Sequence, residues 1–209
     1  LLRVMERLRD PIDGCPWDLK QSFQSIVPST LEECYELADA IEREDFSHLE
    51  EELGDVLFQV IFYCQLGREQ GRFDFEKIVD ILVRKLIRRH PHVFAEGHLE
   101  GRVADARIDS TEVKANWEQV KREERNGKAL SGILADIPPA LPALPRAQKL
   151  QKRAATVGFD WKELSSVLEN LESEIQELRQ AINNDDAANI EEEVGDILFS
   201  AVNVSRHLK

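Results

Sequence analysis

The chain has 209 residues, of which 42% are hydrophobic and 32% are charged, and its formal net charge is −13. This length allows one large domain or two small ones, and the hydrophobic content is enough for a buried core. The acidic balance argues against a protein that wraps nucleic acid, and no apolar stretch approaches the length of a membrane span. The three cysteines form no CxxC pair, so we expect a soluble protein of the reducing cytoplasm.

Helical periodicity dominates the first half of the chain. Apolar residues at helix spacing predict a first helix that stops at Asp10 and Pro11. Capping boxes of the form S-x-x-E predict that further helices begin at Ser29, running to about Arg43, and at Ser47. The residues expected to face inward on these two helices are Cys34, Leu37, Ala38, Ile41, Leu53, Val56, Leu57, Val60, Ile61 and Cys64.

The same pattern continues towards the C-terminus. We expect one helix over about residues 74–89, ending before a proline, and another over about 111–125. After a break, a capping box at Ser166 predicts a helix to about Ile182, and a last helix runs from about Ala187.

A proline-rich stretch, PPALPALP at residues 138–145, divides these helices into two sets. Such a composition is typical of a semi-rigid linker. We therefore expect a first repeat over residues 1–130, a linker over 131–147 and a second repeat over 148–209.

An internal repeat is the most informative feature of the sequence. The segment that begins at Leu31 resembles the segment that begins at Glu172, at a constant offset of 141 positions. Four acidic residues of the first segment therefore recur in register in the second. They are Glu33, Glu36, Glu52 and Asp55, which recur as Glu174, Glu177, Glu193 and Asp196.

These carboxylates are spaced to converge. Glu33 and Glu36 are three residues apart and share one helix face, as do Glu52 and Asp55 on the next helix. The short connection makes the two helices antiparallel neighbours, so the four carboxylates face a common groove. Four such charges repel one another unless a cation neutralises them, and oxygen ligands suit Mg²⁺ or Mn²⁺.

Glutamate-rich helices are more often simply solvated, and that alternative applies to any single ExxE pattern. Two features favour the metal site. Asp55 lies among strongly apolar residues, where an unpaired carboxylate is costly, and the neighbouring Gly54 is a poor helix former. Both features recur in the second copy, at Gly195 and Asp196.

Basic and aromatic residues downstream are candidates for substrate contacts. Lys85 and Arg89 are four residues apart on one predicted helix, and Trp117 and Lys121 are four apart on the next. The first pair is suited to the phosphates of a triphosphate, and the second to a base and a phosphate. A solvated basic face and a core tryptophan are the structural alternatives.

Together these motifs resemble the MazG family of nucleoside triphosphate pyrophosphohydrolases, in its two-repeat form and over essentially the whole chain. The matching elements are RLRDPIDGCPWD, EECYE from Glu32, EELGD from Glu51, KLIRRHPHVF, NWEQVK, QKRAATVGFDW and EEEVGD. The second copy departs from the first at Ser173, which stands where the first copy has Glu32. It also has no counterpart of KLIRRHPHVF or NWEQVK, so we expect this copy to be truncated at its C-terminus.

The resemblance implies an all-α fold of two tandem helical units that dimerise into helix bundles. It implies Mg²⁺-dependent hydrolysis of nucleoside triphosphates between the α and β phosphates, in nucleotide-pool housekeeping or stress regulation. The implied metal-binding and catalytic residues are the eight carboxylates of the two copies. The implied substrate contacts are Lys85, Arg89, Trp117 and Lys121.

Three other functions remain open at this stage. A narrower pyrophosphatase would act on single deoxynucleotides or on phosphoribosyl-ATP. A di-iron carboxylate bundle would need Glu-x-x-His pairs, and none accompanies these carboxylates. A non-catalytic regulatory dimer scaffold would have no reason to keep both sets of carboxylates intact.

Overall fold

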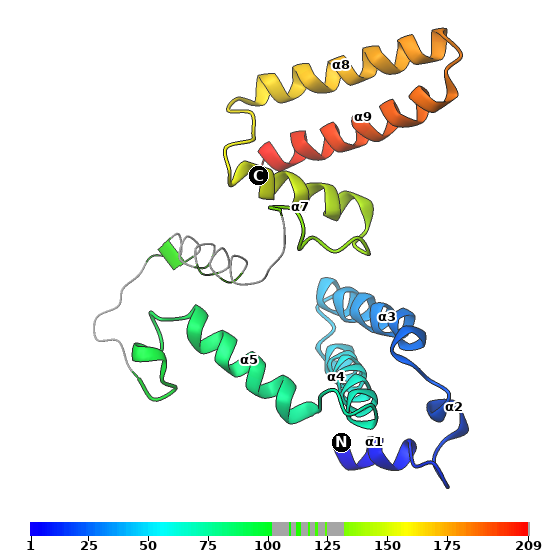
Figure 1. Cartoon of the computed structure of the whole chain (residues 1–209), viewed down its shortest axis with the longest axis vertical. Helices are drawn as coiled ribbons and strands as arrows, with labels where there is room; N and C mark the ends of the chain where they lie inside the picture. The colour runs from blue at the N-terminus through cyan, green and yellow to red at the C-terminus, as the bar shows by residue number, and fades with distance from the viewer. Residues whose placement is uncertain are drawn as a thin grey trace. The chain divides into compact units, whose positions relative to one another are not determined.

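The structure, a computed structural model, describes residues 1–101, 109, 112–113, 117, 120, 124 and 132–208. Every regular element among these residues is a helix, which confirms the all-α prediction (Figure 1). The helix expected over 111–125 lies mostly outside the described residues. The chain divides into two compact units, Leu1–Val120 and Lys121–Lys209. Within the part that is described, no helix is long and apolar enough to cross a membrane.

The first unit is built around two long antiparallel helices, α3 (Phe23–Glu42) and α4 (Phe46–Glu69), which pack along their length. A short turn joins them, so residues far apart in sequence lie side by side. The other described elements of this unit are α1 (Leu2–Leu8), α2 (Pro16–Leu19), α5 (Phe75–Arg89) and the short 3₁₀ helix η1 (Ala95–Gly97).

Capping side chains explain where α3 and α4 begin, and they correct two predicted starts. Ser22 accepts a hydrogen bond from the backbone N–H of Ser25 and forms a capping box with it, so α3 begins before the predicted Ser29. Asp45 caps α4 by accepting from the backbone N–H of His48, so Ser47 is already inside the helix. Both S-x-x-E patterns occur within helices, where a serine does not mark an end.

The core of the first unit lies where α1, α3 and α4 meet. Its fully buried members are Met5, Ile26, Ile61, Phe62 and Leu66, and partly buried aromatic rings surround them. Because α1 packs against α4, the face of α4 that carries these side chains is removed from water. Burial of each large apolar side chain contributes roughly 1.5–3 kcal/mol.

A buried arginine fixes the segment that follows α1. Arg9 donates from Nε and Nη2 to the two carboxylate oxygens of Glu69, at 2.8 and 2.6 Å. Its guanidinium lies 5.4 Å from the centre of the Phe62 ring and also donates to the carbonyl of Asp18. The pairing lowers the pKa of Glu69, chiefly through the hydrogen bond from Arg9. This contact ties the N-terminal segment to the last turn of α4.

The second unit repeats this arrangement with α7 (Ala143–Ala155), α8 (Leu164–Asn183) and α9 (Ala187–His207). The helices α8 and α9 form the antiparallel pair, and α7 packs on α9 as α1 packs on α4. The repeat therefore extends to a third helix that precedes each pair. The predicted capping box at Ser166 is wrong, because α8 begins at Leu164, whereas the predicted start of the last helix at Ala187 is correct.

The proline-rich stretch does not run freely between the two sets of helices. The helix α7 begins at Ala143, so the last residues of the predicted linker are helical. Before it, Ile137 is buried, and Arg153 binds the carboxylate of Asp136 at 2.6 and 3.2 Å and the carbonyl of Ile133 at 3.1 Å. The segment therefore packs against α7, and the domain limits given above stay a prediction.

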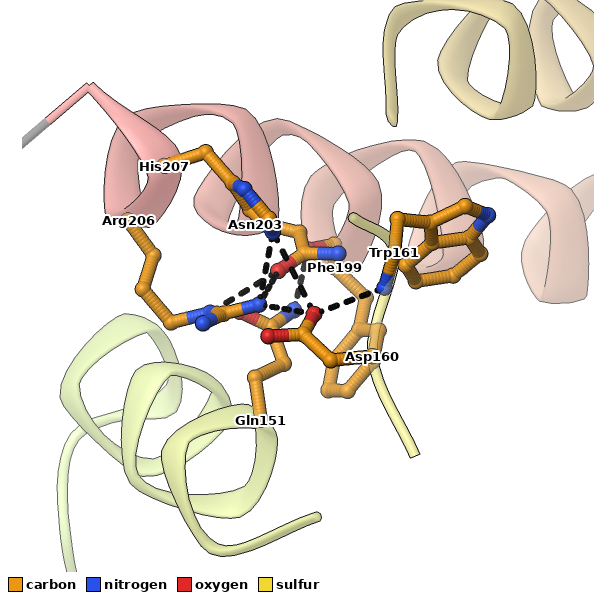
Figure 2. A network of polar contacts seen from close by, with 7 residues as sticks. All are labelled: Gln151, Asp160, Trp161, Phe199, Asn203, Arg206 and His207. Carbon is orange, nitrogen blue, oxygen red and sulfur yellow. Dashed lines mark hydrogen bonds and ion pairs between the residues drawn. The ribbon is translucent and has the colours of Figure 1, made fainter. Parts of the chain in front are cut away.

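A polar network ties the loop between α7 and α8 to the end of α9 (Figure 2). The carboxylate of Asp160 binds Arg206, contacts His207 Nε2 at 3.2 Å and accepts from the backbone N–H of Trp161 at 3.0 Å. Arg206 also donates to Asn203. Burial alone would raise the pKa of Asp160, but the hydrogen bonds from Arg206 and His207 outweigh burial and hold it below its usual value.

The outer face of each helix pair remains exposed within one chain. Six residues predicted to face inward are instead exposed: Cys34, Ala38, Ile41, Leu53, Leu57 and Val60. The reason is geometric, because α1 covers only one side of the α3–α4 pair. The second unit likewise exposes Val194, Leu198 and Phe199 on α9.

Candidate metal centres

Three of the four predicted carboxylates of the first repeat come together between α3 and α4. One oxygen from each of Glu33, Glu36 and Glu52 lies within 4.8 Å of the others. Glu33 and Glu36 are one helical turn apart on α3, and the antiparallel packing of α4 brings Glu52 opposite them. The local spacing and the hairpin together create the cluster.

Glu52 is the buried member of this cluster, with 5% of its surface exposed. Its Oε2 atom is buried and has no hydrogen-bond partner among the described residues, while Oε1 lies 3.1 Å from Nε2 of His48. A buried carboxylate oxygen without a partner carries a large desolvation cost. A cation held between the three glutamates would remove both this cost and their mutual repulsion.

The raised pKa of Glu33 also favours a bound cation at this cluster. Burial first, and then the negative charges of Asp55, Glu36 and Glu52, raise the pKa of Glu33 above its usual value. The contribution of Asp55 shows that this residue lies close to the cluster, although its side chain is exposed. The sequence interpretation of Asp55 as the buried carboxylate is therefore wrong, and Glu52 has that position.

The second unit repeats this geometry on α8 and α9. One oxygen from each of Glu174, Glu177 and Glu193 lies within 4.8 Å of the others, and Glu193 is 8% exposed. Burial, followed by the charges of Asp196 and Glu177, raises the pKa of Glu174. Burial also raises the pKa of Glu193, with the neighbouring carboxylates adding to the effect. Asp196, like Asp55, is exposed beside its cluster.

The donor atoms of both clusters fit a hard divalent cation. Each cluster offers carboxylate oxygens only, with no sulfur or nitrogen ligand, and this donor set suits Mg²⁺, Mn²⁺ or Ca²⁺ rather than Zn²⁺. The buried, unpartnered oxygen of Glu52 distinguishes the first cluster from acidic residues that are simply solvated.

Of the predicted substrate contacts that the structure describes, none belongs to the two helices that carry the carboxylates. Lys85 and Arg89 belong to α5, which leads away from the α3–α4 pair in Figure 1. The ring of Trp117 lies 5.2 Å from that of His90, edge to face. Lys121 lies outside the described residues.

The outer contacts of the two clusters were missed by the sequence interpretation. His48, which no sequence motif singled out, contacts Glu52 one turn further along α4. In the second unit Asn170 donates to Glu174 at 3.2 Å and Ser173 to Glu177 at 2.8 Å. The four-residue spacing of each pair was the available signal.

Comparison with known proteins identifies the family. The sequence profile of the MazG nucleotide pyrophosphohydrolase domain matches residues 21–94 and 162–209, which contain both carboxylate clusters. The chain is 55% identical to a nucleoside triphosphate pyrophosphohydrolase of Escherichia coli K12, over 100% of this chain and 77% of that protein. It is 44% identical to a nucleoside triphosphate pyrophosphohydrolase/pyrophosphatase of Thermotoga maritima, over 100% of this chain and 75% of that protein. The chain belongs to the MazG nucleotide pyrophosphohydrolase family.

Proposed function

We propose that this chain is a nucleoside triphosphate pyrophosphohydrolase that splits the α–β phosphate linkage and releases a nucleoside monophosphate and pyrophosphate. The observation that carries the proposal is the cluster of three glutamates around the unpartnered Glu52 oxygen, repeated in the second unit. The activity named for the E. coli and T. maritima relatives supports the choice of reaction. Nucleotide-pool housekeeping or stress regulation is the role that fits it.

The metal in this proposal is Mg²⁺, with Mn²⁺ as an alternative ion. Glu33, Glu36 and Glu52, with Asp55 beside them, hold it in the first unit. Glu174, Glu177 and Glu193, with Asp196, hold it in the second. Bound Mg²⁺ supplies positive charge that polarises a phosphoryl group and lowers the pKa of a water molecule. Without it, the clustered carboxylates would repel the phosphates of the substrate.

The rest of the reaction falls to side chains outside the clusters. Lys85 and Arg89 neutralise the outer phosphates, and Trp117 and Lys121 contact the nucleotide. Fixed positive groups at the leaving pyrophosphate stabilise charge that develops as the bond breaks. Because α5 leads away from its own α3–α4 pair, Lys85 and Arg89 reach a carboxylate cluster most simply from a second copy of the chain.

The experiment that tests the reaction is product analysis with a panel of substrates. The chain is incubated with ribonucleoside and deoxyribonucleoside triphosphates and with phosphoribosyl-ATP, in Mg²⁺ and in excess chelator. We expect equimolar monophosphate and pyrophosphate from several triphosphates in Mg²⁺, and turnover at background in chelator. Turnover of a single deoxynucleotide or of phosphoribosyl-ATP alone would support the narrower enzyme. Absence of product with every substrate would support the regulatory scaffold.

We also propose that the chain is a homodimer. The apolar residues Leu53, Leu57 and Val60 are exposed on α4, and a partner that covered them would restore the inward role that their periodicity predicts. We expect a mass near twice 23.9 kDa by light scattering at micromolar concentration. The double variant Leu53→Asp, Leu57→Asp is expected to be monomeric, because each charge would have to be buried in the interface.

The matched control for this experiment is Ile12→Asp. Ile12 is an apolar residue that is 94% exposed and belongs to the loop after α1 rather than to the helix pair. It should leave the mass of the wild-type protein unchanged. A monomeric mass for the wild-type chain would rule out the dimer. The cytoplasmic location expected from the cysteine content stays a prediction.

A further inference from the structure

The side chains that contact the two carboxylate clusters from outside are different. In the first unit, His48 Nε2 lies 3.1 Å from Oε1 of Glu52, and Nδ1 lies 3.8 Å from Glu51. Both residues of the closer pair are on α4, one turn apart. Because the imidazole occupies one side of the Glu52 carboxylate, the unpartnered Oε2 is the atom left for a ligand.

The second unit has no such contact at the corresponding place. The residue 141 positions after His48 is Asn189, and among the described side chains none makes this contact to Glu193. Support comes instead from α8, where Asn170 Nδ2 donates to Glu174 Oε1 at 3.2 Å and to Ser200 Oγ at 2.9 Å. Ser200 is buried on α9, so this amide bridges both helices of the pair.

The bridge of the second unit is in turn missing from the first. The residue 141 positions before Asn170 is Ser29, and the counterpart of Ser200 is Gln59. No contact of this kind joins Ser29 to Glu33 within the described part of the first unit. Each unit therefore orients a different glutamate of its cluster. The first orients the buried glutamate of its second helix, whereas the second orients glutamates of its first helix, Glu174 through Asn170 and Glu177 through Ser173.

We propose that His48 is a positioning residue for Glu52 and Asn170 is a positioning residue for Glu174, so that the two clusters bind a divalent cation with separately set affinities. This inference rests on the proposed function, because it assumes that the clusters hold a cation. A free carboxylate rotates about its last bond, and a fixed outer contact keeps an oxygen aimed at the ion. Loss of such an outer contact typically weakens metal binding about 10–100-fold.

Neither residue is expected to matter much for folding. The His48 side chain is 39% exposed, and exposed ion pairs contribute little to stability. The Asn170 amide bonds to Ser200 across the pair, so its replacement by the shorter serine of the first unit is the mildest available change. A selective effect on cation affinity, without an equal effect on thermal unfolding, distinguishes positioning from a purely structural role.

The experiment measures Mn²⁺ affinity of the full chain by calorimetry, one cluster at a time. The background variant Glu193→Gln leaves the first cluster to be measured, and Glu52→Gln leaves the second. We expect His48→Asn to weaken Mn²⁺ binding about 10-fold in the first background, and Asn170→Ser to do so in the second. The reverse change Asn189→His, in the Glu52→Gln background, should strengthen binding by giving Glu193 the contact that Glu52 has.

The controls are the crossed combinations, which place each substitution in the background where its own cluster is disabled. Crossed variants should bind Mn²⁺ as their backgrounds do. Equal weakening in both backgrounds would show a structural effect and overturn the inference, as would changes below about twofold throughout. If the wild-type chain binds Mn²⁺ but no substitution alters its affinity, only this inference fails. If the wild-type chain binds no Mn²⁺, the proposed function fails and this inference fails with it.

Discussion

The double variant Glu52→Gln, Glu193→Gln is expected to release pyrophosphate at least about 100-fold more slowly than the wild-type chain. Changes in the outer contacts of a metal ligand already cost about 10–100-fold, and this variant removes the charge of the buried ligand in each cluster. Glutamine has nearly the same shape, and the charge that it removes repels the other glutamates. The fold should therefore survive, as circular dichroism would show.

The matched control is Glu50→Gln, Glu191→Gln. These two glutamates are exposed, lie on the same helices, and are related by the same offset of 141 positions. The control removes the same net charge and should keep wild-type turnover. The single variants Glu52→Gln and Glu193→Gln then apportion activity between the units. Wild-type turnover by the double variant would rule out the carboxylate-held metal in both.

Thermal stability is expected to depend on Mg²⁺ and on pH in a linked way. Because the folded-state pKa of Glu33 and Glu174 is raised, their stabilising contribution is complete below the ordinary glutamate pKa. It is lost as the pH rises through the raised folded-state value. At pH 8 the metal-free chain therefore carries the cost of burying ionised carboxylates, together with their mutual repulsion, and this cost is smaller at pH 4.

Mg²⁺ should reverse this loss at pH 8. A ligand that binds only the folded state at 100 times its dissociation constant adds about 2.7 kcal/mol per site, which corresponds to a rise of roughly 10 °C in Tm for domains of this size. The rise should shrink as the pH falls, since protonated carboxylates bind metal poorly. Differential scanning calorimetry at several pH values, with Mg²⁺ and with chelator, measures both effects.

The variant Glu33→Gln isolates the cluster from every other titrating group in this experiment. In chelator it should be more stable than the wild-type chain at pH 8, because one charge that is partly buried and repelled by its neighbours is gone, and the difference should shrink towards pH 4. Its response to Mg²⁺ should be reduced in the first unit. A Tm shift with Mg²⁺ that is the same at pH 5 and pH 8, or that survives in Glu52→Gln, Glu193→Gln, would place the cation elsewhere.

Local rules were enough to predict most of the helices and the grouping of three glutamates in each repeat. The i,i+3 spacing of Glu33 and Glu36 places them on one helix face, and the short turn before α4 brings Glu52 opposite. The repeat at an offset of 141 positions then predicted a second cluster of the same kind. Both the shared helix face and the hairpin depend on residues close together in sequence, so periodicity and spacing were able to predict them.

The sequence alone did not show which face of each helix is buried, because that depends on the segments that pack against it. Glu52 is buried where α4 faces α3, whereas Asp55 stays exposed, although the two lie only one turn apart on α4. The start of α3 depends on Ser22 and Ser25, whereas the more familiar S-x-x-E pattern at Ser29 lies inside the helix. The contacts of His48 with Glu52 and of Asn170 with Glu174 follow the four-residue spacing on one helix, but that spacing does not show that Glu52 is buried or that Asn170 also bonds to Ser200 on α9. Periodicity gives the angle between two side chains on a helix, but only the packed structure shows which of them water can reach.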